Sequence, residues 1–340
     1  MSSEEKKRGM KTAPSPLASR LSPLAAPPAI LLMGPTASGK TAVAAAIAEA
    51  LGCEIISVDS AQIYKHMNIG TAKPEAELLA RAPHHLIDII EPHERYSAGR
   101  FRDDALALMR EITEERGKIP LLAGGTMLYF QALTEGLNEL PEADTAIRMM
   151  IDTMAEESGW PALHEQLSRV DPQTAARLQP NDAQRIQRAL EVYYLTNKPL
   201  SEFHKQPKYV YFPYTPIRIA LIPGDRALLH ERIAQRFEIM LELGLIGEVR
   251  KLRQQYALDP AMPSMRCVGY RQAWQYLDGE FGLAALREKG VAATRQLAKR
   301  QLTWLRSMRD VTEFDCLAQD LDDQVLEFVR RKLAQPAVVG

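Results

Sequence analysis

The 340-residue sequence has little of what marks secreted, metal-binding or membrane proteins. Its three cysteines, Cys53, Cys267 and Cys316, are far apart and form no C-x-x-C pair or Cys/His cluster, which argues against a structural zinc site. So sparse a cysteine content suits a reducing compartment. No run approaches the roughly 18 apolar residues of a membrane span, and the polar first 20 residues do not resemble a signal peptide. We therefore expect a cytoplasmic protein that is not bound to a membrane.

An excess of charge of either sign is also absent. Lys and Arg number 42 against 43 Asp and Glu, so the formal net charge is −1. This balance excludes a wholly basic nucleic-acid coat but leaves room for local patches. The hydrophobic fraction of 46% and the charged fraction of 25% are those of soluble globular proteins. At about 150 residues per domain, the length predicts roughly two domains.

The chain begins with a segment that has no hydrophobic periodicity. Residues 1–28 hold five Lys or Arg and five Pro, which predicts a disordered leader. Such a basic leader could contact RNA, although a solvated leader is the simpler interpretation. From residue 29, short apolar runs alternate with helical patterns, which is typical of a parallel sheet with helices on both faces. We expect strands at 29–33, 54–58, 86–90, 119–123 and 218–222, and helices at 41–51 and 97–116.

The middle of the chain has a different pattern. Residues 139–213 show no convincing strand before the aromatic stretch 209–214, and instead carry amphipathic segments at 145–158, 161–169, 172–178 and 182–196. We interpret this region as an all-helical insertion domain within an α/β core formed by residues 29–138 and 214–315. Further helices are expected at 227–243 and 247–255, and in pieces up to residue 309. Residues 316–340 are expected to form a separate acidic tail with one helix at 321–333.

One motif points directly to phosphate chemistry. Residues 34–41, GPTASGKT, match G-x-x-x-x-G-K-[ST], with a predicted strand before them and a helix after them. In such a loop, backbone N–H groups and a helix N-terminus face phosphate oxygens, Lys40 adds a full positive charge, and the Thr41 hydroxyl can hold Mg²⁺. We therefore expect a core like that of the P-loop NTPases. The residues expected to bind a diphosphate are Gly34, Pro35, Thr36, Ala37, Ser38, Gly39, Lys40 and Thr41.

An acid follows the second strand, whereas none follows the strand at 119–123. That later strand ends in Gly124, Gly125 and Thr126, where most nucleotide hydrolases carry an Asp that assists Mg²⁺. The carboxyl ends of parallel strands meet at the ligand crevice, so Asp59 should face the bound diphosphate. Asp59 could act there as a general base or near magnesium, or it could simply cap a following helix.

Seven blocks in order carry a family resemblance: GPTASGKT, ISVDSAQIYKHMNIGTAKP, HHLIDI, GGTMLY, NDAQRIQRALEV, RCVGYRQAW and TRQLAKRQLTWLR. Together they resemble the bacterial tRNA dimethylallyltransferases, also called tRNA isopentenyltransferases, of the IPP transferase family. The resemblance spans about residues 29–309 and leaves out the leader and the acidic tail. It implies transfer of a dimethylallyl group from dimethylallyl diphosphate to N6 of adenosine 37, just 3′ of the anticodon in tRNA, with release of diphosphate.

The resemblance also implies roles for particular residues. Asp59 would accept the N6 proton or hydrogen-bond the amine, Thr126 would orient the adenine or the base, and Arg236 would join Lys40 on the diphosphate. These three are the expected catalytic residues, and Mg²⁺ is the expected cofactor. The blocks that match the family's tRNA contacts are Asp59, Ser60, Ala61, Gln62, Gln184, Arg185, Ile186, Gln187, Arg188, Arg266, Cys267, Val268, Gly269, Tyr270, Arg271, Lys299, Arg300, Gln301, Leu302, Thr303, Trp304, Leu305 and Arg306.

A basic segment near the C-terminus is consistent with RNA binding. Residues 264–309 hold nine Lys or Arg against three acids. On a helix, Arg295, Lys299 and Arg306 fall near one face, which is the footprint expected of phosphate contacts, although solvated helix faces have the same pattern. The expected partner is the anticodon stem-loop, clamped between core and insertion, and we expect a monomer without an obligate protein partner.

Two other functions share parts of this pattern. A small-molecule kinase would have the phosphate loop, the second-strand acid and Mg²⁺, but would not require the basic segment or the arginines of the insertion. A non-catalytic RNA-binding module could use the loop to sense nucleotide, and would not depend on Asp59. The tRNAs modified, the donor chain length and the order of substrate binding are not revealed by the sequence.

Overall fold

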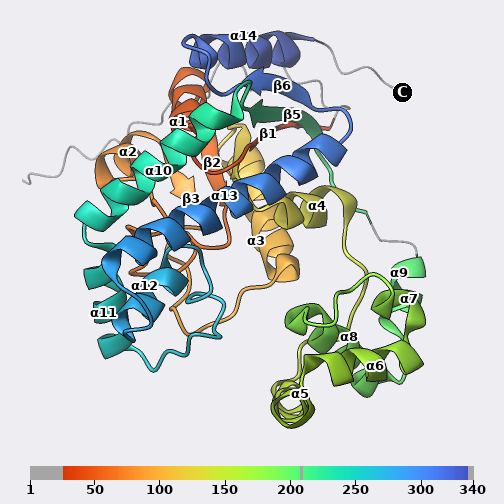
Figure 1. Cartoon of the computed structure of the whole chain (residues 1–340). Coiled ribbons are helices and arrows are strands. Elements are labelled where there is room, and N and C mark those ends of the chain that lie inside the picture. The colour runs from red at the N-terminus through yellow and green to blue at the C-terminus, as the bar shows by residue number, and fades with distance from the viewer. Residues whose placement is uncertain (1–25, 207–209, 336–340) are drawn as a thin grey trace, which may run out of the picture. The chain divides into compact units, whose positions relative to one another are not determined.

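The computed structural model describes residues 26–206 and 210–335. Its centre is a six-stranded sheet with the order β3-β2-β4-β1-β5-β6, in which every neighbouring pair of strands is parallel (Figure 1). The strands are β1 (Pro28–Met33), β2 (Glu54–Val58), β3 (His84–His85), β4 (Pro120–Gly124), β5 (Thr215–Ile222) and β6 (Thr312–Asp315). The sequence prediction of a parallel α/β core is confirmed.

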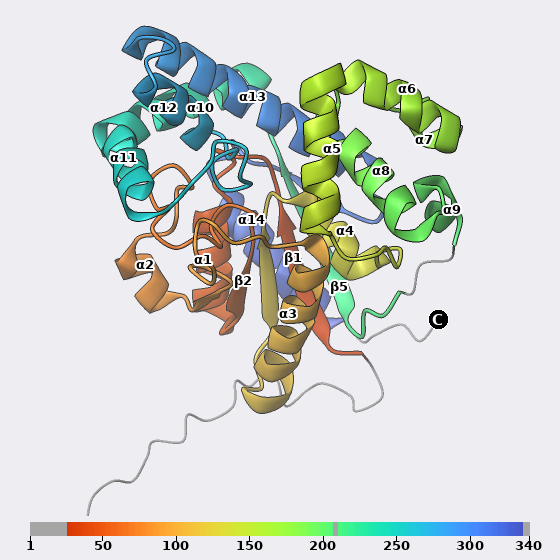
Figure 2. The ribbon, with the colours of Figure 1, turned by 90° about the horizontal axis from the view of Figure 1, so that it is seen from below.

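Both faces of this sheet are buried, which explains why β1 reads as an unbroken apolar run. Alternate residues such as Ile30 and Leu32 pack against α1 (Lys40–Leu51) and α14 (Leu321–Ala334). In Figure 2, α3 (Ala98–Arg110) lies on the side of the sheet opposite α14. A π-helical turn, η2 (Glu111–Glu115), continues α3, and α4 (Met127–Glu135) follows β4.

Four further helices of the core form a cluster of their own. They are α10 (Arg226–Glu242), α11 (Leu245–Gln255), α12 (Tyr270–Leu277) and α13 (Leu283–Ser307). Their apolar faces pack together with residues of the segment that follows β2, such as Ile63 and Met67. At the crossing of α10 and α13, a Cβ on Gly290 would lie 1.9 Å from the Phe237 ring. Glycine at this position therefore permits the close approach that sets the two helices side by side.

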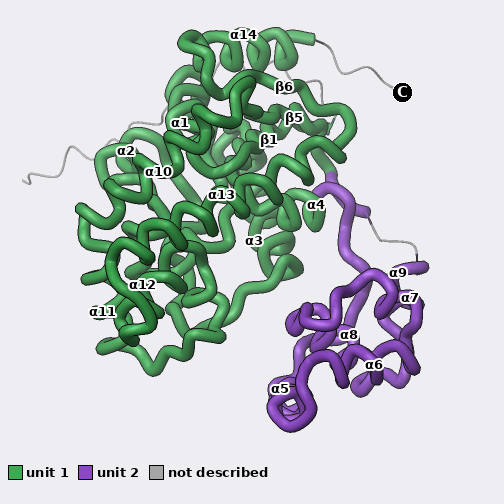
Figure 3. The backbone as a smooth tube through the Cα atoms, in the orientation of Figure 1, with its two compact units in different colours: residues 1–133, 213–340 green, residues 134–212 purple. Residues whose placement is uncertain are grey.

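The chain forms two compact units, residues 1–133 with 213–340 and residues 134–212 (Figure 3). The second unit holds α5 (Thr145–Ser158), α6 (Trp160–Val170), α7 (Pro172–Ala175), α8 (Ala183–Thr196) and α9 (Leu200–Lys205), around its own core. Its described residues are all helix or loop, as expected, but it begins at Thr134 and not at residue 139. The short α9 had no counterpart in the sequence prediction.

The helix expected at 321–333 is confirmed as α14, but the expectation that residues 316–340 form a separate acidic tail is wrong. Leu321, Val325, Phe328 and Val329 of α14 are buried in the same core as α1 and the sheet, so the segment after residue 315 belongs to the first unit. The acids of this segment misled the prediction because they occupy the solvent side of an amphipathic helix, while its apolar side faces the core. Residues 1–25 of the expected leader lie outside the described residues, and β1 already begins at Pro28.

Three other expectations need correction. The strand predicted at 86–90 is absent, because Leu86 and Asp88 have positive φ of 61° and 56°, which a strand does not allow. The strand there is the two-residue β3, and Ile90 makes only an isolated bridge to Tyr64. The aromatic residues 210–214 form no strand, and residues 207–209 lie outside the described part. The short β6 and α2 (Ala76–Arg81) were not predicted.

None of the helices within residues 26–206 and 210–335 is both long enough and apolar enough to span a bilayer.

Candidate active site

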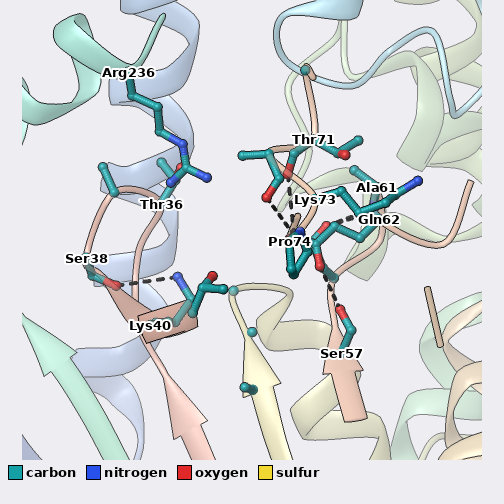
Figure 4. A pocket seen from close by; sticks show the side chains of 18 of the residues that line it. Thr36, Ser38, Lys40, Ser57, Ala61, Gln62, Thr71, Lys73, Pro74 and Arg236 are labelled. Atoms are coloured by element: carbon teal, nitrogen blue, oxygen red, sulfur yellow. Dashed lines mark hydrogen bonds between the residues drawn. The ribbon is translucent and has the colours of Figure 1, made fainter. Parts of the chain in front are cut away.

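A cavity of about 490 Å³ opens in the first unit at the carboxyl ends of β1, β2 and β4 (Figure 4). Its walls come from the phosphate loop, the turn after β2, the segment 70–75, the end of β4, the helices α10 and α13, and the segment 267–269. Ligand crevices of parallel sheets are expected at this edge. The pieces are distant in the sequence, and the parallel topology brings them together.

The phosphate loop has the backbone geometry that its motif requires. Ala37 and Gly39 take left-handed conformations with φ of 63° and 80°, and α1 begins at Lys40. A Cβ on Gly34 would lie only 2.8 Å from the Ser38 hydroxyl oxygen, so a side chain at residue 34 would disrupt the loop. The Lys40 ammonium donates hydrogen bonds to the Pro35 carbonyl at 2.6 Å and to the Ser38 hydroxyl at 3.4 Å (Figure 4). The positive charge is therefore held inside the loop and not in solvent.

Two partly buried cations, Lys40 and Arg236, face this cavity. Burial lowers the pKa of Lys40 to about 8, against the opposing effect of the Asp59 charge, and Arg236 adds repulsion. Burial also lowers the pKa of Arg236, which extends from α10 into the cavity near Thr36 (Figure 4). No hydrogen bond ties the Arg236 guanidinium to another described residue. A bound anion would offset the cost of burying both charges.

Asp59 follows the last residue of β2 and lines the cavity. Its Oδ1 accepts hydrogen bonds from the N–H groups of Ala61 at 2.8 Å and Gln62 at 3.3 Å. No helix follows Asp59, so the helix-capping role that the sequence left open is wrong; the structure shows a cap of the turn at 60–63 instead. It uses one carboxylate oxygen, and Oδ2 makes no hydrogen bond to any residue in the described part of the chain. The second oxygen is thus available to a ligand.

Thr126 lies directly beyond β4 and holds the turn that carries Asp59. Its N–H donates to the Val58 carbonyl at 3.1 Å, and its Oγ1 accepts from the Ser60 N–H at 3.0 Å. A Cβ on Gly124 would lie 2.1 Å from the Val58 carbonyl oxygen, so β4 approaches β2 this closely only because residue 124 is glycine. Thr126 itself is not among the side chains that line the cavity, although its hydroxyl is bound to the residue next to Asp59.

Another wall of the same cavity is apolar. Ile233, Phe237 and Met240 of α10, Leu297 of α13 and Val268 contribute hydrocarbon surface close to the phosphate loop. An amphiphilic ligand with a phosphate group and a short hydrocarbon chain would match both walls. The sequence did not predict this wall, because its members look like ordinary core residues of three separate segments.

The segment 68–73, which borders the cavity, is held by a carboxylate that sequence reasoning missed. Glu248 of α11 accepts hydrogen bonds from the N–H groups of Asn68 and Ile69, both at 2.9 Å, and also from the Tyr270 hydroxyl. From the other side, the Gln62 side chain bonds the Ser57 hydroxyl and the carbonyl of Thr71. No sequence signal identifies Glu248, because its backbone partners lie about 180 residues away and its other partner, Tyr270, looks like an ordinary core residue.

The expected RNA contacts on α13 divide into three sets. Arg295, Lys299, Arg300, Thr303, Trp304 and Arg306 are exposed. The four cations among them make no ion pair with any residue that the structure describes. The side chains of Leu302 and Leu305 are buried in the core, so they support the helix and are not placed to face RNA. Gln301 faces the cavity.

The block at 266–271 is divided in the same way. Arg266 and Arg271 are exposed, whereas Cys267, Val268 and Gly269 line the cavity. Tyr270 is fully buried, and its hydroxyl is bound to Glu248, which places its side chain in the core and not at the surface.

The block at 184–188 lies on α8 in the second unit. Gln184 and Arg185 are exposed, and Arg185 pairs with Asp182 at 3.1 Å. Arg188 instead pairs at 2.6 Å with the fully buried Glu191, which also pairs with Arg148. Gln187 donates to Asp152, and Ile186 is buried in the core of this unit. The residues at 59–62 and those at 184–188 thus belong to different units.

Comparison with known proteins identifies relatives along most of the chain. A family model described as IPP transferase matches residues 62–308, and one described as isopentenyl transferase matches residues 28–89. The tRNA dimethylallyltransferase of Nitrosospira multiformis is 61% identical over 303 residues, which cover 89% of this chain and 94% of that protein. That of Nitrosomonas europaea is 59% identical over 304 residues, covering 89% of this chain and 96% of that protein.

Solved structures agree with this assignment. The full-length tRNA isopentenylpyrophosphate transferase of Bacillus halodurans is 38% identical with a TM-score of 0.66, and the match covers 90% of this chain and 96% of that one. A eukaryotic dimethylallyltransferase acting on tRNA is 28% identical with a TM-score of 0.71, covering 91% of this chain and 78% of that one. The ordered blocks, the parallel core and these relatives lead to one conclusion: the chain belongs to the IPP transferase family, together with the tRNA dimethylallyltransferases.

Proposed function

We propose that this protein transfers the dimethylallyl group of dimethylallyl diphosphate to N6 of adenosine 37 in tRNA and releases diphosphate. The observation that carries the proposal is one cavity that combines a phosphate loop, two partly buried cations, an acid that ends a strand and an apolar wall. The relatives named tRNA dimethylallyltransferase support it. In this reaction the bond between the allylic carbon and the diphosphate oxygen breaks, a bond from N6 to that carbon forms, and N6 loses a proton.

The leaving group needs neutralisation, because the allylic carbon is a good electrophile only when its diphosphate can depart with its charge stabilised. The loop N–H groups, Lys40 and Arg236 line the cavity and are placed to provide this stabilisation. The five-carbon chain would lie against the apolar wall formed by α10 and α13. No phosphoryl group moves, which agrees with the absence of an acid after β4.

Magnesium fits this site only as an ion held mainly by the substrate. Within the described residues there is no group of three or more His, Cys, Asp or Glu side chains that could hold a metal. The Thr41 hydroxyl is a hard donor, and Mg²⁺ commonly combines one or two such groups with phosphate oxygens and water. When bound, the ion would add positive charge to the diphosphate.

The acceptor requires a base, because the adenine N6 amine is a weak nucleophile until its proton is removed. Asp59 and Glu75 are the acids that line the cavity. Asp59 directly follows β2 and keeps a free carboxylate oxygen, and we assign it this role. Thr126 would support it by holding Ser60, next in the chain. The target base must leave its stack to reach such a cavity, as in other enzymes that modify bases.

The test is incubation of the purified protein with tRNA and either labelled dimethylallyl diphosphate or γ-labelled ATP. Label transferred to tRNA from the first donor alone supports the proposal. Label transferred from ATP to a small molecule would instead indicate a kinase.

The Asp59→Asn variant separates catalysis from RNA binding alone. It keeps the size and the turn-capping oxygen but loses the proton acceptor, so single-turnover transfer should slow by about 10²–10⁴-fold. Transfer near the wild-type rate would remove Asp59 from its assigned role. Circular dichroism checks that the variant is folded.

A further inference from the structure

The strands β1 and β4 lie side by side, and their loops separate at the edge of the cavity. The ladder between them ends at the pair Met33 and Gly124. Beyond it, one chain becomes the phosphate loop and the other becomes the turn that leads to Thr126. The loop serves the leaving diphosphate and the turn supports Asp59, so the relative position of the two sets the distance between donor and acceptor.

A single side chain spans this separation. The Oε1 of Gln301, on α13, accepts a hydrogen bond from the Thr36 N–H at 2.9 Å, and its Nε2 donates to the Gly125 carbonyl at 2.9 Å. The amide therefore bonds a donor of one chain and an acceptor of the other, as a peptide group does in a sheet. Both bonds have the length expected of N–H···O hydrogen bonds.

The fit around this amide is tight on the strand side. A Cβ on Gly125 would lie 2.3 Å from the Gln301 Nε2 and 3.2 Å from the Gly34 carbonyl oxygen. The glycine pair after β4 thus leaves room for the Gln301 amide between the two loops.

The contacts continue from Gly125 to the acid. Thr126, the next residue, bonds the backbone on both sides of Asp59, through the Val58 carbonyl and the Ser60 N–H. A continuous path therefore runs from Thr36 in the phosphate loop through Gln301 to the turn that carries Asp59.

We propose that Gln301 is a positioning residue that sets the phosphate loop relative to the Asp59 turn, and that it is not an RNA contact. The proposal rests on the proposed function for its effect on transfer. It differs from the expectation drawn from the sequence, which placed Gln301 among the tRNA-binding residues. The outer face of α13 would bind RNA while its cavity face aligns the two halves of the site.

The test compares Gln301→Met with Gln296→Met. Methionine has a similar length and volume but no amide, so it removes both hydrogen bonds without leaving a large void. Gln296 is exposed on the same helix and makes no side-chain hydrogen bond to a described residue, which makes it the matched control. Three quantities are measured: the single-turnover rate constant at saturating tRNA and donor, the amplitude of that turnover, and the Kd for tRNA.

We expect the Gln301→Met rate constant to fall by about 10- to 100-fold, because a misplacement of about 1 Å can cost 10²-fold. The amplitude and the tRNA Kd should stay within about twofold, since such small changes match the spread of neutral surface substitutions. Gln296→Met should match the wild type throughout. A reduced amplitude with a normal rate constant would show a folding defect only, and a tRNA Kd that rises in step with the rate loss would show an RNA contact. Either result, or an unchanged rate, overturns the proposal.

A second measurement does not depend on the transfer reaction. The affinity for inorganic pyrophosphate, measured by calorimetry, should weaken by about 2- to 12-fold in Gln301→Met, the effect of one neutral hydrogen bond that anchors the loop. If the wild type transfers no dimethylallyl group, the proposed function fails, and this measurement still decides whether Gln301 aligns the loop. Unchanged pyrophosphate affinity would overturn that part.

Discussion

The first unit holds positive charge in two very different places. Lys40 and Arg236 lie partly buried in the cavity, where desolvation lowers the pKa of both. The cations on the outer face of α13, such as Arg295, Lys299 and Arg306, are exposed and have no ion-pair partner among the described residues. A buried charge is costly until one well-fitted anion arrives, whereas exposed charges bind a long polyanion through many weak contacts that salt screens. The contrast suggests one set for the diphosphate and the other for RNA.

Arginines of the second unit show a third arrangement. Arg148 and Arg188 both pair with the fully buried Glu191, so their charges already have a partner inside the protein. Residues 134–212 as a whole carry eight Lys or Arg against twelve Asp or Glu. A count of arginines in the sequence therefore overstates the charge that this unit offers to RNA, and Arg185 is a stronger candidate contact than Arg188.

The largest effect should come from Lys40→Ala. Removing the charge that stabilises the leaving diphosphate should slow single-turnover transfer by about 10²–10³-fold. The tRNA affinity in gel shifts should stay near that of the wild type, because the buried ammonium does not reach the outer surface. Lys299→Ala serves as the control. It should weaken tRNA binding and leave the single-turnover rate at saturating tRNA near that of the wild type. Loss of tRNA affinity in parallel with rate in Lys40→Ala would break the division between the two sets.

Replacing Arg295, Lys299 and Arg306 together by Ala tests the other set. Removing one cation that binds a phosphate should reduce the slope of log affinity against log salt by about 0.7 to 0.9, so the slope should flatten by roughly two to three units in the triple variant. The Kd for dimethylallyl diphosphate should not change. If the triple variant keeps the parental slope, these residues form a solvated face, and the RNA surface lies on residues such as Arg185, Arg266 and Arg271.

The pH dependence of pyrophosphate binding should follow Lys40. Its pKa is lowered to about 8 in the free cavity, and a bound anion raises it, so the complex holds more protons than the free protein above pH 8. The contribution of Lys40 to pyrophosphate affinity should therefore be constant below pH 8. Above pH 8 it should lower the affinity by at most about tenfold per pH unit. The ratio of wild-type to Lys40→Ala affinity isolates this effect from ionisation of pyrophosphate itself. A ratio that is flat from pH 7 to 10 would contradict the shifted pKa.

A smaller effect separates the two arginines of α8. Arg188→Met leaves the buried Glu191 with Arg148 as its remaining ion-pair partner, and should lower the free energy of unfolding by about 1–3 kcal/mol. Arg185→Met removes an exposed pair and should change stability by less than about 0.5 kcal/mol, while reducing the salt slope of tRNA binding. Urea denaturation and salt titration of both variants give the comparison. If Arg188→Met instead reduces the salt slope of tRNA binding and Arg185→Met lowers the stability, then Arg188 faces RNA.

The parts of the site that depend on local sequence could be predicted. The phosphate loop is a contiguous motif, and Asp59 follows a strand whose carboxyl end must reach the crevice. The sequence singled out Gln301 as an RNA contact, but neither its bridging role nor Glu248 could be predicted, because most of their partners are backbone groups that only the folded chain brings near. The place of α14 also depends on the folded chain. Its acids suggested a tail, whereas its apolar side chains pack in the same core as the sheet. The strand predicted at 86–90 failed for a local reason. Leu86 has a positive φ, and a leucine in the sequence does not indicate that conformation.

Transfer of a dimethylallyl group to adenosine 37 can be tested by mass spectrometry of tRNA nucleosides from cells that lack the gene. We expect N6-isopentenyladenosine to be absent from those cells, to return when the wild-type gene is restored, and to be strongly reduced when only the Asp59→Asn gene is supplied. An unchanged level of N6-isopentenyladenosine in cells without the gene would contradict it.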